Sequence, residues 1–116
     1  MEIRGHQYAA IQGSVFIDSA SGTEGEVIAG KAGKTLYINY MVISISEWKN
    51  QSDYIEIRDG SGGYAFINFE VGANYGTRIY PVFLGEYGYS LTQGNGLFAN
   101  STATQDITVT ALGYYK

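Results

Sequence analysis

A long run of β-type sequence in the first half of the chain changes the parity of its apolar positions half-way along. Leu36, Ile38 and Tyr40 fall on even positions, whereas Met41 and the isoleucines that follow it fall on odd ones. A strand buries every second residue, so such a switch would turn the core face outward unless a β-bulge inserted one extra residue. We therefore predict a bulge or sharp bend between Tyr40 and Val42.

A shorter strand follows, in which Ile55 and Ile57 alternate with polar neighbours. The segment between the two runs, Trp48–Asp53, is polar and is expected to be a turn. We predict that the two runs pair as a hairpin and that the other strands pack around it.

The remaining alternating segments predict further short strands separated by glycine-rich turns. Asp59 and Gly60 form a dipeptide that favours a tight hairpin turn, and Pro81 cannot donate a hydrogen bond to a ladder, which places its strand at an edge or a bulge. Besides the long run, the predicted strands are residues 14–18, 26–29, 54–58, 64–71, 78–84, 97–99 and 106–112. About eight strands at this spacing indicate an all-β antiparallel sandwich or barrel.

Length and composition fit one such domain. The chain has 116 residues and no cysteine, with 16 glycines, 11 tyrosines and one proline. Disordered chains are poor in aromatic residues, so the glycines are interpreted as turn residues. We expect residues 13–116 to form a single β-sandwich domain and residues 1–12 to form an N-terminal arm or a first edge strand.

The charge pattern argues against several classes of partner. The chain has seven basic and 11 acidic residues, for a net charge of −4, and these charged residues are scattered along the sequence. Nucleic-acid binding needs clustered basic side chains, so no nucleic-acid partner is expected. No stretch has the roughly 20 apolar residues of a membrane span, and the N-terminus lacks the apolar core of a signal peptide. We expect no membrane partner, and a protein that is made inside the cell and is not secreted by the usual route.

No catalytic or cofactor-binding constellation is apparent. The GKAGKT segment at 30–35 resembles part of a phosphate-binding loop, but Ile28 stands where that motif needs its first glycine, and a strand follows instead of a helix. His6 has no acid or nucleophile at a recognisable spacing. The acidic residues show no calcium-loop spacing and are expected mostly to be solvated; they are Glu24, Glu26, Asp53, Asp59, Glu70, Glu86 and Asp106. We therefore expect no enzyme activity, no cofactor and no metal ion.

Three tyrosines are the only candidate contact residues. Tyr75, Tyr87 and Tyr89 lie in glycine-rich segments where a ring is expected to be exposed. Exposed aromatic rings stack on sugars or bury in protein interfaces. The alternative is that these three rings only cap the ends of the sandwich. Tyr40 is different, because its position in the alternating run predicts that it is buried.

Several stretches in order along the chain resemble small β-sandwich proteins of tailed bacteriophage virions. These stretches are "AGKTLYINYMVISIS", "RDGSGG", "FEVGANYG" and "LTQGNGLFANSTATQDITVTALGYYK", and the likeness covers about residues 27–116. The resemblance implies a jelly-roll-like sandwich that decorates or cements a capsid, with an N-terminal arm that grips the shell.

From the resemblance we expect a non-enzymatic capsid decoration or cement protein on the virion surface. Its partners would be the major capsid protein and its own copies, assembled as a homotrimer. The tyrosine content leaves an alternative open, a carbohydrate- or receptor-binding β-sandwich module associated with a virion fibre or tail.

Overall fold

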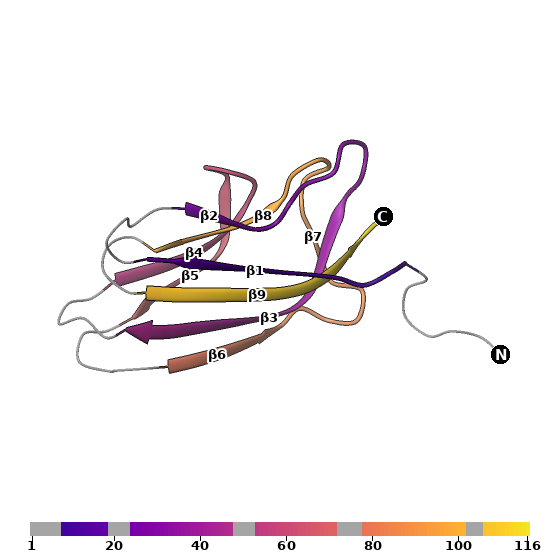
Figure 1. Ribbon diagram of the computed structural model, residues 1–116. Coiled ribbons are helices and arrows are strands. Elements are labelled where there is room, and N and C mark those ends of the chain that lie inside the picture. The colour runs from indigo at the N-terminus through magenta and orange to yellow at the C-terminus, as the bar shows by residue number, and fades with distance from the viewer. Residues whose placement is uncertain (1–7, 19–23, 48–52, 72–77, 102–105) are drawn as a thin grey trace.

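A computed structural model describes residues 8–18, 24–47, 53–71, 78–101 and 106–116 as two antiparallel β-sheets packed face to face (Figure 1). The described part of the chain contains nine strands and no helix, so the expected all-β sandwich is confirmed. The strands are β1 (Ile11–Ile17), β2 (Glu24–Ile28), β3 (Leu36–Glu47), β4 (Asp53–Asp59), β5 (Tyr64–Val71), β6 (Arg78–Phe83), β7 (Tyr89–Ser90), β8 (Leu97–Ser101) and β9 (Asp106–Tyr115).

The strand order is that of a jelly roll. One sheet has the order β1-β9-β3-β6, with β7 pairing with β3 beside β6, and the other has the order β2-β8-β4-β5. Leaving out the two-residue β7, eight strands pair first with eighth, second with seventh, third with sixth and fourth with fifth. This is one long antiparallel hairpin rolled into two sheets, as in other jelly-roll domains.

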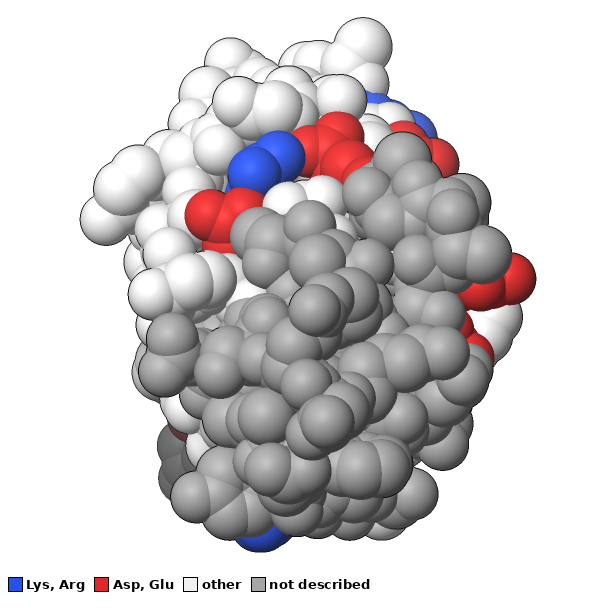
Figure 2. Space-filling view, turned by 90° about the vertical axis from the view of Figure 1, so that its left-hand side faces the viewer, with Lys and Arg blue, Asp and Glu red and all other residues white. Residues whose placement is uncertain are grey.

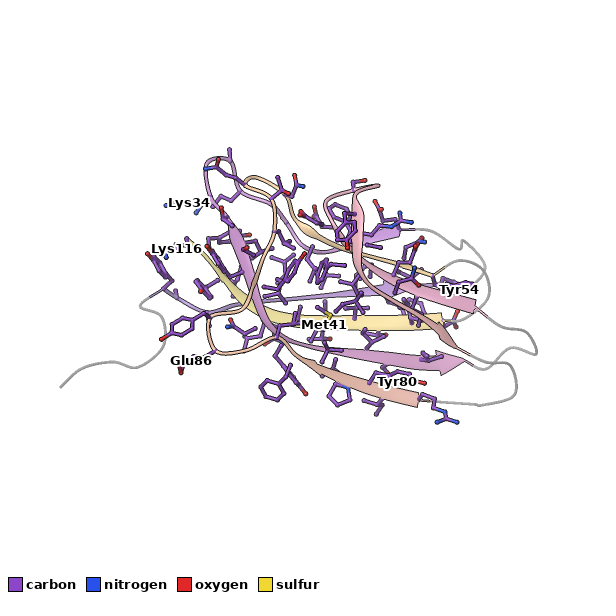
Figure 3. The ribbon with its side chains drawn as sticks, turned by 180° about the vertical axis from the view of Figure 1, so that it is seen from behind. Lys34, Met41, Tyr54, Tyr80, Glu86 and Lys116 are labelled. Atoms are coloured by element: carbon purple, nitrogen blue, oxygen red, sulfur yellow. The ribbon has the colours of Figure 1, made fainter. Side chains whose placement is uncertain are left out.

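The core lies between the sheets and is almost wholly aliphatic. Ile43, Ile45 and Val109 point inward from the first sheet, and Ile55 and Ile57 point inward from the second, all with no exposed surface. Met41 lies near the middle of the sandwich in Figure 3. Burial of this kind contributes roughly 1.5–3 kcal/mol per large side chain, and it follows the alternation that the sequence displays.

The predicted bulge in the long strand is present, but at Asn39. Ile38 pairs with Gly113 and Tyr40 pairs with Leu112, which leaves Asn39 as the extra residue of β3. The predicted window began one residue later, because it placed Tyr40 on the core parity. Tyr40 instead lies half-buried on the outer side of the sheet. The bulge thus restores the inward direction of Met41 and the isoleucines after it.

Asn39 also fixes the neighbouring loop. Its side-chain amide donates to the carbonyl oxygens of Gly85 (3.1 Å) and Glu86 (2.6 Å), and its own carbonyl accepts from the Leu84 amide. The edge partner of β3 changes at this residue, from β7 on one side to β6 on the other. The ninth strand, β7, was missed because only two residues of its glycine-rich segment pair.

The predicted pairing between the long run and the next strand is wrong. β3 pairs with β9, β6 and β7, whereas β4 lies in the opposite sheet and pairs with β5 and β8. Alternation fixes which side of each strand is buried, and both strands satisfy it by facing each other across the core. The connection at 48–52 lies outside the described residues.

Two local predictions are confirmed. β4 and β5 form a hairpin through Asp59–Gly63, with Gly60 and Gly62 at φ values of +86° and +64° that favour glycine. Pro81 lies in β6, the edge strand of its sheet. Ile11 and Gln12, which were grouped with the N-terminal arm, are the first residues of β1, and residues 1–7 lie outside the described ranges.

Candidate interaction surface

The outer side of the first sheet carries no charged residue over twelve neighbouring positions. We call these positions the uncharged face. Register aligns them in three rows, each crossing β1, β9, β3 and β6 in that order. The rows are Gln12, Leu112, Tyr40 and Phe83; Ser14, Thr110, Val42 and Pro81; and Phe16, Thr108, Ser44 and Ile79.

The exposed apolar side chains of the described residues concentrate on the uncharged face. Phe83 is 83% exposed, Ile79 67%, Phe16 57% and Leu112 40%. These four are every strongly exposed phenylalanine, isoleucine or leucine in the described part of the chain, where the other strongly exposed large hydrophobic side chains are tyrosines. Scattered exposed apolar residues are normal, but a contiguous apolar surface marks an interaction site.

A groove of about 220 Å³ crosses the uncharged face next to Phe83. It is lined by Gln12, Tyr40, Val42, Thr110, Ala111 and Leu112, all of them uncharged. The ring of Tyr40 separates the groove from Phe83, whose ring centroid lies 4.9 Å from that of Tyr40. A projecting ring and a hollow therefore lie side by side on one surface.

Two hydroxyl groups on the uncharged face bond to each other. The side-chain oxygens of Ser14 and Thr110 lie 3.0 Å apart and share a hydrogen bond across β1 and β9. A polar group that loses water without a partner costs free energy. Because one of the two hydroxyls donates to the other, covering this pair costs less free energy than covering two unpaired hydroxyls.

Towards the end of β9, the same side of the sheet continues into three stacked tyrosines, which we call the tyrosine row. The ring centroid of Tyr114 lies 5.6 Å from that of Tyr8 and 5.1 Å from that of Tyr37, with interplanar angles of 9° and 8°. The Tyr114 hydroxyl donates to the Tyr87 carbonyl oxygen at 2.6 Å. Burial raises the pKa of Tyr114, as do the nearby hydroxyls of Tyr37, Tyr8 and Tyr87.

The outer side of the second sheet is different in kind. Arg58 bridges Glu24 (2.9 Å) and Glu56 (2.6 Å), and Asn100 donates to Glu56 (3.0 Å). Figure 2 shows a view in which a basic group lies between acidic ones. Charges on this side are thus tied to each other and hydrated, in contrast to the uncharged face.

Glu24 joins this charged side to the hairpin turn. Its carboxylate accepts from the Ser61 hydroxyl (2.6 Å), the Gly62 amide (2.7 Å) and Arg58. Burial acts against ionisation, but the three hydrogen bonds outweigh it and lower the pKa of Glu24 below its usual 4.5. This acid, expected to be only solvated, therefore has a structural role.

Two of the three tyrosines singled out from the sequence lie among the described residues. Tyr87 is 62% exposed, and Tyr89, in β7, is 36% exposed and stacks on Phe66 with ring centroids 4.3 Å apart. Tyr75 lies outside the described residues. The exposed residues of the uncharged face were missed, because a row of neighbouring positions becomes visible only when the strand order is known. The available signal was the lack of charge at the outward positions of four strands.

The described residues contain no group of three metal-ligating side chains. They also contain no helix long and apolar enough to cross a membrane. Asp59, one of the candidate acids, accepts hydrogen bonds from the Thr92 amide (2.9 Å) and hydroxyl (2.8 Å) and from the Asn95 side chain (3.0 Å). It therefore holds a loop, and His6 lies outside the described residues.

No known family model matches the sequence, and no curated protein is detectably similar to it. Solved structures of similar shape include the following two. One is a chain of the Bacillus endospore appendages, a family of disulfide-linked pili, with 12% identity and a TM-score of 0.45 over 98% of this chain and 95% of that chain. The other is a chain of the virus-like particle of the extra small virus of the prawn Macrobrachium rosenbergii, with 11% identity and a TM-score of 0.42 over 99% and 83%. With TM-scores below 0.5, neither likeness decides the function.

Proposed function

We propose that this chain is a non-enzymatic structural subunit of a virion, a capsid decoration or cement protein that acts by burying surface against neighbouring subunits. The observation that carries the proposal is the uncharged face, with its four exposed apolar side chains. The core of a protein interface is depleted of charge and enriched in aromatic residues, and this face has both properties. The virion as its location rests on the sequence resemblance to bacteriophage β-sandwich proteins.

Two further features favour assembly over chemistry. A jelly roll exposes the outer sides of two sheets, which suits contact by shape, and an exposed apolar patch marks an interaction site. The hydrogen bond between Ser14 and Thr110 lowers the cost of covering this part of the uncharged face. The partners would be the major capsid protein and neighbouring copies of this chain.

The proposal is tested with capsids assembled without this protein. Purified chain is added, and the capsids are sedimented and then heated. We expect the chain to sediment with the capsids and to raise the temperature at which they release their contents. Absence of both effects would refute the decoration role.

A second candidate function is glycan binding, which the 62% exposure of Tyr87 favours. Its backbone is held by the Tyr114 hydroxyl, so the ring is presented from a fixed loop, and sugars stack on such rings. A glycan array that gives signals with the wild-type chain and none with Tyr87→Ala would support it. An array without any signal would exclude it.

A further inference from the structure

We propose that the partner of the uncharged face is a second copy of this chain, held in a two-fold dimer in which each Phe83 ring enters the groove of the other copy. This inference deepens the proposed function and rests on it, since it names what covers the face. In an isologous contact the same patch meets itself, so the patch must complement its own shape and charge.

Charge favours self-contact. The chain carries a net charge of −4, so two copies repel each other over most orientations. The uncharged face is a broad sheet surface where equal copies meet without placing like charges opposite each other, which costs several kcal/mol in an interface. The other sheet would instead bring Glu24 and Glu56 close to their equivalents.

Shape favours it as well. Phe83 projects with 83% of its surface exposed, and the groove of about 220 Å³ lies one ring away. A cavity of about 150 Å³ is enough to hold a benzene molecule, so the groove can take a phenyl ring. A two-fold axis that passes between the ring and the groove places the Phe83 ring of each copy in the groove of the other copy.

The area is sufficient for a weak dimer. The three rows of the uncharged face extend about 20 Å along the strands and about 19 Å across four of them, an area of roughly 400 Å². Two such surfaces bury about 800 Å², the size of a weak, transient interface. We therefore expect half-dimerisation at micromolar concentrations or above.

The edge of the sheet is a poorer contact than its face. The Leu84 amide bonds to Asn39 of β3, so by alternation the nitrogen of Pro81, three residues earlier, lies on the side of β6 away from β3. An added strand would need a donor at that position, and proline has none. Copies are thus directed to meet face to face. Such a contact closes after two copies and is an alternative to the homotrimer that the resemblance implies.

The test is sedimentation equilibrium of the purified full chain alone, over a range of concentrations. We expect a mass that rises from the chain mass of 12.6 kDa towards twice that value. Phe83→Asp places two like charges at the contact and is expected to weaken dimerisation at least tenfold. Tyr64→Asp adds the same charge at a side chain that is 72% exposed and off the uncharged face, and is expected to leave the dimer unchanged.

Circular dichroism and thermal unfolding check that both variants are folded, and Phe83→Ser is the second variant if Phe83→Asp is not. A wild-type chain that stays monomeric at its highest soluble concentration, or that forms a trimer, would overturn the inference, and so would equal weakening by both aspartates. Capsid binding by a monomeric wild-type chain would leave the proposed function standing and assign the face to the capsid protein. A dimer that does not bind capsids would refute only the decoration role.

Discussion

At the scale of single residues, a few polar side chains hold the loops of this sandwich in place. Asp59 lies at the end of β4 and binds Thr92 and Asn95, which belong to the loop before β8. Glu24 binds the turn between β4 and β5. Both acids occur in turn-like or strand-end sequence, which gave no sign of a partner 30 or more residues away.

Removal of the Asp59 carboxylate is expected to destabilise the fold. Asp59→Ala leaves the Thr92 and Asn95 donors without their acceptor, and a hydrogen bond to a charged group contributes about 1.5–3 kcal/mol. We expect the free energy of unfolding, measured with urea by circular dichroism, to fall by about 2 kcal/mol. Glu86→Ala, at an exposed loop position, should change it by less than about 0.5 kcal/mol. Equal losses in both variants would contradict this role.

Glu24 makes stability depend on acid pH. A carboxyl whose pKa is lowered by folding contributes stability that is fully present above its unfolded pKa and is lost as the pH falls through its folded pKa. The folded pKa of Glu24 lies below 4.5, so this part of the stability should disappear below about pH 4.5. Unfolding experiments at pH 7 and pH 3 should show a smaller difference for Glu24→Gln than for the wild type. An unchanged difference would show that Glu24 is not responsible.

Tyr114 has the opposite dependence. Its pKa is raised above 10 by burial and by neighbouring tyrosines, so the stability it contributes is present below pH 10 and is lost as the pH rises through its folded pKa. An ultraviolet titration should show a late ionisation step, above pH 10, that comes from Tyr114. Tyr114→Phe should abolish that late step, whereas Tyr64→Phe, at a solvated position, should keep it.

At the scale of strands, the sequence predicts well where the strands lie along the chain and poorly which strands pair with each other. The alternation of Ile107 and Val109 with threonines correctly predicted which side of β9 is buried. The change of parity after Tyr40 predicted a bulge, which lies at Asn39. Alternation contains no information on which strand lies alongside, and for that reason β3 and β4 were paired wrongly. The uncharged face could not be assembled for the same reason, since its rows combine four strands that are far apart in the sequence.

Replacing the bulge residue, Asn39, tests whether its side chain holds the loop after β6 against β3. Asn39→Ala removes two hydrogen bonds to the loop after β6, and we expect a loss of about 1–2 kcal/mol in the free energy of unfolding. Hydrogen exchange of the amides at 84–88 should become faster while that of β9 is kept. Asn68→Ala, at an exposed position in β5, is the matched control and should alter neither. Protection that persists at 84–88 would argue that the bulge alone holds this loop.

At the scale of the whole molecule, the two sheets differ in what they present outward. One has a network of ion pairs around Arg58, and the other has the uncharged face and the tyrosine row. One outer side of the sandwich therefore carries charged residues, whereas the other has none over twelve neighbouring positions.

The arrangement of β9 has a consequence for how the protein is made. β9 lies between β1 and β3, yet it is synthesised after the other eight strands. Until β9 leaves the ribosome, β1 has no hydrogen-bonded neighbour in its own sheet, and β3 has neighbours along only one of its two edges. Folding of this sandwich must therefore wait until β9 has been synthesised, and pairings between distant segments make it slow. A nascent chain stalled before residue 106 should remain sensitive to protease, and the same chain extended until β9 has emerged should become resistant.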